Sequence, residues 1–474
     1  MRTGICLVLT LLTTTVHATP LLLGGETSSM GGSGAASGRD AAMFLLNPAG
    51  LARMGSTWLS LSASVYGMAR VAVPRFFNEG STAQTDLGQV ELEGVKLGST
   101  SFVGYPSQAS LVVGLGPEPG SPGHMIIGGC LVIPDHVSRF FEGTTRAVNL
   151  TASQSFEWSH KHSEMYFGPA FAIQIGRRLL LGASLLLLYY SFDNLVSGPF
   201  VLSDPKGTVY LSVDGKSVGQ GTSLDFVPVV GGQLQLTDHL ALGLAITAPA
   251  LHLTGGFSGS GQWRSYGNNP QTNSVRLSTL EGETTANNPL KGTVGLSYRR
   301  ERQFGVALDF TLLAPRERFH QLQTRDSLLT LRPGYEPEQV ESSTTSAAGS
   351  QLAFQVNVGA EWYFKPSWVL RGGAFVDRPT IPDLDGPPGM DQLLDLHLTR
   401  LGGTLGLSAV EGLIETTLGV ALIYGTGTTV GYNFAQPDPS KAFRETDARS
   451  IDLLIILSGG FDIGEIQRAL GRRL

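Results

Sequence analysis

The feature that most constrains this 474-residue chain is a two-residue alternation that recurs from residue 57 almost to the C-terminus. Successive side chains of a β-strand point to opposite faces, so this pattern separates the two faces of a sheet. In residues 303–314 one face is wholly apolar and the other is small or polar: Phe304, Val306, Leu308 and Phe310 against Gly305, Ala307, Asp309 and Thr311. Residues 239–249 and 350–364 divide in the same way. We therefore predict that one face of the sheet meets hydrocarbon, where an Arg or Lys near mid-bilayer would cost about 2–4 kcal/mol.

Short and long gaps between these segments alternate along the chain. Short gaps, such as residues 176–178 and 365–367, look like tight turns, while the long gaps are polar and rich in Gly, Ser, Asn and Pro. The long gaps are residues 75–97, 141–152, 196–222, 254–288, 315–349, 379–393 and 426–447. Outer-membrane barrels have short turns on the periplasmic side and long loops outside. The spacing predicts an all-β fold, a transmembrane antiparallel β-barrel.

The alternating segments number about 14, an even number that places both ends of the barrel domain, residues 57–462, on the periplasmic side. The predicted strands are residues 57–73, 99–115, 124–140, 153–175, 178–195, 223–236, 239–252, 289–300, 303–314, 350–364, 367–378, 395–408, 411–425 and 449–462. The bounds of the first three are the least defined, because Pro74, Pro106, Pro117 and Pro134 interrupt them.

The composition is typical of a membrane barrel. Charged residues are 15% of the chain, against about 25% in soluble domains, and 61 glycines are nearly twice the usual share of about 7%. A membrane helix needs about 20 apolar residues, and the longest apolar stretch, residues 179–192, is shorter. A secreted β-sandwich or propeller is the alternative, but its outer face would carry Lys, Glu and Thr. The mildly negative, unclustered charge argues against nucleic acid as a partner.

The N-terminus predicts an export signal. Arg2 supplies a positive charge, and residues 5–18 form an apolar stretch that ends in a small-residue cleavage site, so we expect residues 1–18 to be removed. Cys6 would leave with this signal, and Cys130 alone cannot form an internal disulfide. We expect a multi-pass protein of the outer membrane of a Gram-negative bacterium, surrounded by outer-membrane lipid and inserted by the barrel-assembly machinery.

Residues 19–56 are the candidate plug of the barrel. A 14-stranded barrel has a lumen too wide for its own side chains to fill. The sequence GGSGAASG lets the backbone pack closely, and residues 41–46 have apolar, helix-forming side chains before Pro48. A disordered linker with a short capped helix is the alternative.

The stretch SGRDAAMFLLNPAGLARM resembles the N-terminal hatch of the FadL-type long-chain fatty acid transporters of bacterial outer membranes. The signature of that hatch is Asn-Pro-Ala, here Asn47, Pro48 and Ala49. The chain departs from the usual barrel pattern at its C-terminus, because residues 463–474 follow Phe461 instead of ending on an aromatic residue. We expect residues 463–474 to form a periplasmic tail.

The resemblance implies a monomeric, plugged, 14-stranded barrel for uptake of hydrophobic molecules, either long-chain fatty acids or aromatic hydrocarbons. Substrate would be captured among extracellular loops, for which RFFEG (139–143) and FFNEG (76–80) are candidates, and passed to a pocket against the hatch. It would leave laterally where the third strand kinks. Gly128, Gly129 and Pro134 fit such a kink, since glycine weakens a ladder and proline cannot donate to one. Alternatively, Pro134 marks the extracellular end of the strand.

The inner wall carries an apolar patch in residues 178–195. Its inward face includes Leu186, Leu188, Tyr190 and Phe192, a surface that suits either a hydrophobic ligand or packing against the hatch helix.

The inner wall also carries charged residues. If Phe364 pairs with Trp368 across the short turn, Glu361 lies opposite Arg371 on the inner face, and this pair attracts. This pair could form a polar network with Asp309, Glu415, Arg400 and Asp452. We interpret this network as structural pairing within the wall, and a role in transport is the alternative.

Motifs of other functions are missing from the sequence. It has no G-x-S-x-G, H-E-x-x-H or phosphate-binding loop, so we predict no enzyme and no cofactor, with a hydrolase built from scattered loop residues as a residual alternative. His160 and His162 are two residues apart near a strand end, where we expect them to face solvent and bind no metal. Two other functions remain open, a structural or adhesin-like surface barrel and a diffusion porin.

Overall fold

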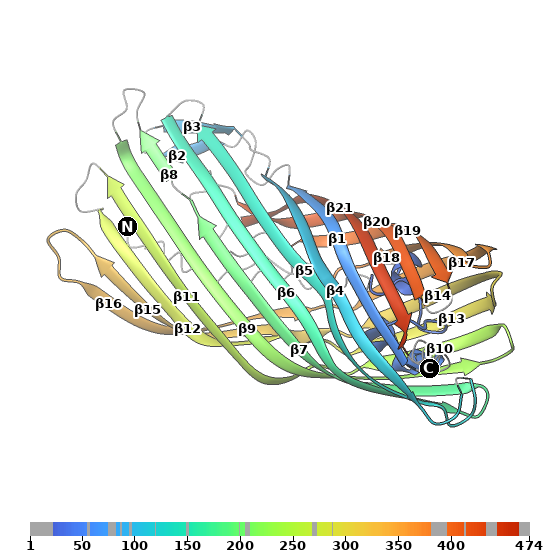
Figure 1. The fold of residues 1–474 in the computed structure, drawn as a ribbon. Coiled ribbons are helices and arrows are strands. Elements are labelled where there is room, and N and C mark those ends of the chain that lie inside the picture. The colour runs from blue at the N-terminus through green and yellow to red at the C-terminus, as the bar shows by residue number, and fades with distance from the viewer. Residues whose placement is uncertain are drawn as a thin grey trace, which may run out of the picture.

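The computed structural model describes residues 22–463 except 55–56, 74–81, 86–87, 94–96, 119, 148–150, 199, 204–208, 268–272, 287, 381–395, 412–413 and 433–442. The fold is a closed antiparallel β-barrel of 14 strands (Figure 1), which confirms the predicted fold class. The ring closes between β1 (Thr57–Val73) and β21 (Phe443–Asp462), which pair from Trp58–Asp462 to Ala72–Arg449.

The strands follow one another around the ring in chain order. Between β1 and the composite strands lie β4 (Leu97–Leu115), β5 (Met125–Ala147), β6 (Thr151–Ile175), β7 (Leu179–Ser197) and β9 (Val209–Gln235). After the composite strands come β18 (Trp368–Asp377), β19 (His397–Glu411) and β20 (Ile414–Tyr432). Three short strands, β2 (Thr82–Thr85), β3 (Gly88–Glu93) and β8 (Phe200–Ser203), extend the sheet at one end.

Four of the 14 traverses are composite strands. They are β10 (Leu240–Thr247) with β11 (Leu251–Gly267), β12 (Ser274–Ala286) with β13 (Lys291–Arg300), β14 (Phe304–Leu313) with β15 (Arg316–Leu331), and β16 (Glu338–Ser350) with β17 (Ala353–Lys365). Pro249, Pro289 and Pro315 lie at three of the four breaks. Proline has no N–H to donate, so each interrupts the ladder at that point.

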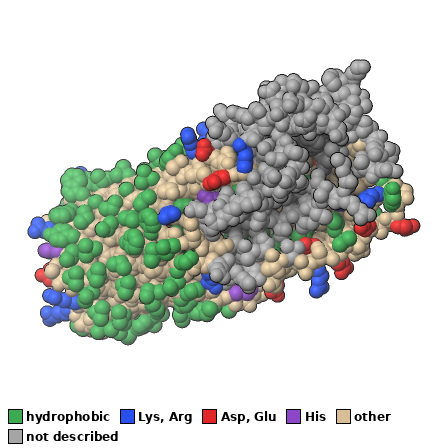
Figure 2. Space-filling model, turned by 180° about the vertical axis from the view of Figure 1, so that it is seen from behind, with side chains coloured by type: hydrophobic (Ala, Val, Ile, Leu, Met, Phe, Trp, Pro, Cys, Tyr) green, Lys and Arg blue, Asp and Glu red, His purple; other side chains and the backbone are tan. Residues whose placement is uncertain are grey.

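The predicted division into two faces is present. On β14 the outward side chains are about half exposed, such as Leu308 at 49%, while Asp309 on the other face is 3% exposed. On the face that Figure 2 shows, the outward hydrophobic side chains gather in a belt at the end of the barrel that carries the short turns, with charged side chains along its rim. This belt has the composition expected of a surface that meets hydrocarbon.

The predicted long loops are in large part wrong, because most of them continue the strands. Residues 254–288 contain most of β11 and all of β12, and residues 315–349 contain β15 and most of β16. β9 has 27 residues, whereas a membrane-crossing strand needs about 9–11. Strands beyond the belt have water on both faces and need no apolar face, so a polar sequence there resembles a loop. Parts of the predicted loops 75–97, 379–393 and 426–447 lie outside the described residues.

Residues 22–54, the N-terminal segment, lie inside the barrel near the short turns (Figure 1). The segment contains α1 (Glu26–Ser29), α2 (Met43–Leu46) and the 3₁₀-helix η1 (Pro48–Arg53), and nearly all of its residues are buried. Among the described residues, no helix combines the length and the apolar character needed to cross a bilayer.

Candidate functional site

The Asn-Pro-Ala motif forms the joint between two short helices. α2 ends at Leu46, and the next residue, Asn47, has an extended backbone with φ of −161°, as steric contact with a following proline favours. Pro48 then begins η1, where its missing N–H costs nothing. The Ala49 N–H donates to Asn47 Oδ1 at 3.2 Å and caps the new helix. The predicted helix over residues 41–46 is thus present as the single turn α2.

The side chain of Asn47 also fixes the segment to the barrel. Its Nδ2 donates to the carbonyl oxygen of Ala35 at 2.6 Å and to that of Gly232 on β9 at 3.1 Å. Asn47 is fully buried. One amide thus joins both halves of the segment and the wall, which explains why an asparagine, with donors and an acceptor, occupies this position.

The Gly-rich half of the segment is held by polar side chains of the wall. Asp309 Oδ2 on β14 accepts from the N–H groups of Gly34 and Ala35 at 2.7 and 2.8 Å. Asn357 on β17 and Thr404 on β19 donate to the carbonyl oxygens of Gly31 and Ser29, both at 2.8 Å. The wall side chains therefore satisfy backbone groups that form no regular ladder.

Glycines on the inner face permit this close approach. A Cβ added at Gly373 would overlap the backbone of Met30 and Gly31, and one added at Gly243 would overlap that of Ala35. At the neighbouring outward-facing Gly372, the nearest heavy atom to such a Cβ lies 3.7 Å away. The high glycine content thus serves contact between the wall and the segment at these positions.

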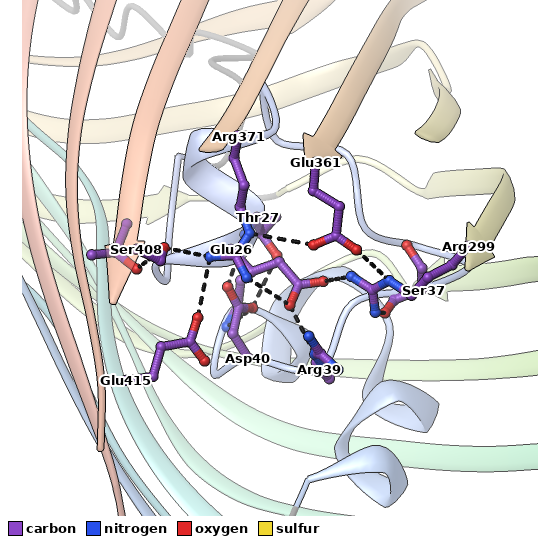
Figure 3. Close-up of polar contacts among 12 residues, drawn as sticks. Glu26, Thr27, Ser37, Arg39, Asp40, Arg299, Glu361, Arg371, Ser408 and Glu415 are labelled. Carbon is purple, nitrogen blue, oxygen red and sulfur yellow. Dashed lines mark hydrogen bonds and ion pairs between the residues drawn. The ribbon is translucent and has the colours of Figure 1, made fainter. Parts of the chain in front are cut away.

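A buried ion network binds the segment near the short turns (Figure 3). Glu26 pairs with Arg299 of β13, with Arg39 at 3.0 Å and with Arg371 at 3.7 Å. Burial opposes the charge on Glu26, but the three arginines outweigh it and hold the pKa of this carboxyl far below its usual value. Glu361 pairs with Arg299 at 2.5 Å and with Arg371 at 3.5 Å.

The structure places Glu361 directly opposite Arg371, in the register that the short turn indicated. The tip differs, because a bulge after Tyr363 pairs Trp368 with Lys365 instead of Phe364. Arg371 is fully buried and also pairs with Glu415 at 3.1 Å.

The remaining members of the predicted polar network lie elsewhere. Asp309 binds backbone N–H groups, as described above, and Arg400 lies opposite Asp377 of β18. Asp452 on β21 shares a strand face with the buried Ser450.

The second half of the segment packs against an apolar sector of the wall. Met43, Phe44 and Leu51 are fully buried in a cluster whose wall members come from β4, β5, β6, β7 and β9. Two of the predicted wall residues, Leu186 and Leu188, belong to this cluster. The other two, Tyr190 and Phe192, form an adjoining cluster with Phe257 of β11.

An aromatic row continues from these residues along the inner wall. The ring centroids of Trp158 and His160 lie 5.4 Å apart in parallel planes, and those of His160 and His162 lie 5.3 Å apart. The ring centroids of His162 and Tyr190 lie 6.3 Å apart, and those of Tyr190 and Phe192 lie 5.9 Å apart. His160 and His162 are 1% and 4% exposed, so the prediction that they face solvent is wrong. The alternation on β6 points them inward. Within the described residues, no group of three or more potential metal ligands occurs.

The sequence-predicted kink residues lie at different places in the ladders. Gly128 and Gly129 pair regularly with both β4 and β6. The β5–β6 register shifts between Val132 and Asp135, that is, at Pro134. On the other side, the β4–β5 ladder stops after Gln108–Val132 and resumes only at Gly98–Glu142. The interruption therefore lies at Pro134 and not at the two glycines.

Sequence reasoning missed Glu26, Arg39 and Arg299. Arg299 lies near the end of the predicted strand 289–300, where no partner is indicated, and Glu26 and Arg39 lie in a segment without periodicity. A usable signal was present, since acidic and basic residues are otherwise sparse in the Gly- and Ser-rich residues 19–56.

Asp40 makes docking of the segment dependent on pH. It accepts hydrogen bonds from the Thr27 N–H and hydroxyl, both at 2.9 Å, but burial and the nearby Glu26 raise its pKa from 3.8 to about 6. Ionisation of Asp40 therefore opposes docking. The stabilisation is complete below about pH 4, and up to about 3 kcal/mol is lost as the pH rises through 6.

We expect the open probability of the protein in planar bilayers to increase between about pH 4 and 6, the interval between the two pKa values of Asp40. Asp40→Asn should flatten this profile because the amide does not titrate. A profile that is equally steep in Asp40→Asn would assign the pH dependence to another group.

Comparison with solved structures identifies the fold. A FadL homologue of Pseudomonas aeruginosa matches with a TM-score of 0.56 at 13% identity, over 94% of this chain and 100% of the other. The toluene transporter TodX of Pseudomonas putida matches with a TM-score of 0.56 at 13% identity, over 93% and 98%. The monoaromatic hydrocarbon channel CymD matches with a TM-score of 0.53 at 15% identity, over 94% and 99%. No protein-family model and no curated protein matches the chain. The protein therefore belongs to the class of 14-stranded antiparallel β-barrels. In particular, it has the fold shared by the FadL homologue and these hydrocarbon channels, as the resemblance at Asn47–Ala49 indicated.

Proposed function

We propose that this protein is an outer-membrane facilitator for uptake of hydrophobic molecules. The observation that carries the proposal is the position of the apolar cluster of the N-terminal segment. It includes Phe44 and the wall residues Val132 and Leu188, and Val132 forms the last β4–β5 pair before the interruption. A dry apolar surface inside a barrel, next to a break in its wall, is suited to hydrophobic ligands and unsuited to water-filled diffusion.

The proposed path has three parts. Substrate enters at the end with the long strands and passes along the aromatic row and the cluster of Tyr190 and Phe192. It then reaches Leu188 and Phe44 at the segment. It leaves laterally between β4 and β5, where the described backbones of residues 99–107 and 133–141 form no ladder with each other. The names of the neighbouring structures, toluene and monoaromatic hydrocarbons among them, support a hydrophobic cargo.

The proposal includes the topology. The N-terminal segment acts as a hatch that closes the lumen, and the many buried contacts described above support this role. The short turns face the periplasm, the long strands face the exterior, and the protein is a monomer that reaches the outer membrane through its export signal and the barrel-assembly machinery. The belt in Figure 2 supports this orientation.

Uptake by cells tests the proposal. Cells that lack the gene, complemented with the wild type, should accumulate labelled oleate or an alkylbenzene faster than uncomplemented cells. Leu188→Asn should lower this rate at least fivefold, because a fully buried apolar wall position becomes polar. Thr293→Asn, on the polar sector of the inner wall, is the matched control and should leave uptake unchanged.

The alternatives give different results. Equal uptake with and without the gene would refute transport and favour a structural or adhesin-like barrel. A large constant conductance of the wild type in planar bilayers would favour a porin. A heat-dependent shift in gel mobility verifies that each variant forms its barrel.

A further inference from the structure

A cavity of about 630 Å³ opens at the short-turn end of the barrel, beside the last residues of the N-terminal segment. Arg39 and Arg53 of the segment line it, with Trp58 of β1, Tyr363 of β17 and Pro366 in the turn. Its size is in the range of small-molecule sites. It borders the apolar cluster through Met54, which belongs to both, and Trp58, which packs against the cluster, but the proposed path does not pass through it.

Arg53 differs from the other arginines near this cavity. Arg39 and Arg299 each pair with Glu26, whereas the partners of Arg53 are neutral amides. Its Nε donates to Gln233 Oε1 at 2.7 Å and its Nη2 to Gln235 Oε1 at 3.1 Å. In the part of the chain that the structure describes, no carboxylate lies within ion-pair distance of Arg53. Its guanidinium is thus positioned by two hydrogen bonds without an ion pair, and Glu26 and Glu301 stabilise its charge only from a distance.

The environment of Arg53 as a whole disfavours this charge. Burial, followed by the positive charges of Arg299 and Arg39, lowers the pKa of Arg53 to about 10. The side chain is still cationic at neutral pH. An anion in the cavity would offset both costs. Carboxylates and phosphates both match the planar fork of a guanidinium, and a carboxylate attached to an apolar body would also contact the apolar lining residues Trp58 and Pro366.

The acidic residues around the cavity do not fill this role. Glu415 already pairs with Arg371, and Glu301 and Glu411 are exposed at the rim, where water screens their charge. The apolar and aromatic part of the lining comes from Met54, Trp58, Tyr363, Pro366 and Val410.

We propose that this cavity is a binding site for a small carboxylate with an apolar body, an alkyl or aryl carboxylate. The carboxylate binds the guanidinium of Arg53, and the apolar body contacts Trp58 and Pro366. Because Arg53 belongs to the N-terminal segment, a bound carboxylate also joins the segment to the rim of the barrel. This proposal rests on the proposed function in one respect only: the proposed topology places the mouth of the cavity on the periplasmic side of the membrane.

Binding of octanoate to the full chain in phosphatidylcholine nanodiscs, measured by calorimetry, tests the site. We expect the wild type to bind octanoate at least tenfold more tightly than octan-1-ol, which lacks the charge. Arg53→Gln should weaken octanoate binding at least tenfold and leave octanol binding unchanged. Arg177→Gln is the matched control, because Arg177 is exposed in a short turn outside the cavity.

Unchanged octanoate affinity in Arg53→Gln, or an equal loss in Arg177→Gln, would overturn the proposal. If Arg53→Gln does not form its barrel, the octanoate affinity of Arg302→Asn tests the site instead. Arg302 is an exposed cavity residue with φ of 53°, a conformation that asparagine tolerates. A loss of at least threefold in Arg302→Asn supports the site, and an unchanged affinity refutes it. Because binding is measured on purified protein, Arg53-dependent binding together with absent uptake would refute the proposed function and leave the site intact.

Discussion

Replacing Glu26 with glutamine is expected to release the N-terminal segment and turn a nearly silent barrel into a conducting one. Glu26 is 4% exposed and neutralises Arg39, Arg299 and the fully buried Arg371. Glutamine keeps the shape but removes the charge, so the three arginines lose the carboxylate that they share, and only Arg299 and Arg371 keep Glu361. Breaking a buried pair in this way costs about 3–5 kcal/mol. That cost increases the undocked population on the order of 10²–10³-fold, which single-channel recording in planar bilayers would detect as frequent large openings.

Glu301→Gln is the control for this change. Glu301 is an exposed residue of a short turn at the same end of the barrel, so the same substitution removes a screened charge and should leave the recordings silent. If Glu26→Gln is as silent as the wild type while its barrel forms, the ion network does not hold the segment in place.

The wall of the barrel could be predicted from the sequence because its determinants are local. Alternation fixes which face a side chain occupies, and a short turn fixes the register of its two strands. That is why Leu308 lies outside, Asp309 inside, and Glu361 opposite Arg371. The bulge after Tyr363 alters the pairing at the tip but does not propagate, because the register below it is unchanged.

The interior could not be predicted to the same extent because its contacts join residues far apart in the chain. Glu26 and Arg299 are 273 residues apart, and no periodicity relates them. The pairing of Asn47 with Gly232 is similar, so the motif was identified by resemblance while its partners were not. The lengths of the strands were underestimated for another reason, since polar strands outside the belt lack the apolar face by which strands were identified.

The second large effect is expected from a single added side chain at Gly373. Valine at this inward-facing position would place its Cβ on the backbone of Met30 and Gly31. Gly31 has φ of +68° and is held by Asn357, so the segment cannot shift locally without breaking that contact. The strand itself cannot yield, because it is paired on both sides. We therefore expect Gly373→Val to displace the Gly-rich half of the segment and give frequent openings in planar bilayers.

Gly372→Val separates this steric effect from any general effect of valine in the strand. The two glycines are adjacent on β18, so strand propensity changes equally, but the side chain at Gly372 faces outward with its nearest neighbour 3.7 Å away. Barrels of this variant should form normally and stay silent. Equal openings in both variants would mean that the strand was weakened, whereas silence in both would mean that the segment adapts to the added volume. Openings in Gly373→Val alone would show that direct contact between wall and segment keeps the lumen closed.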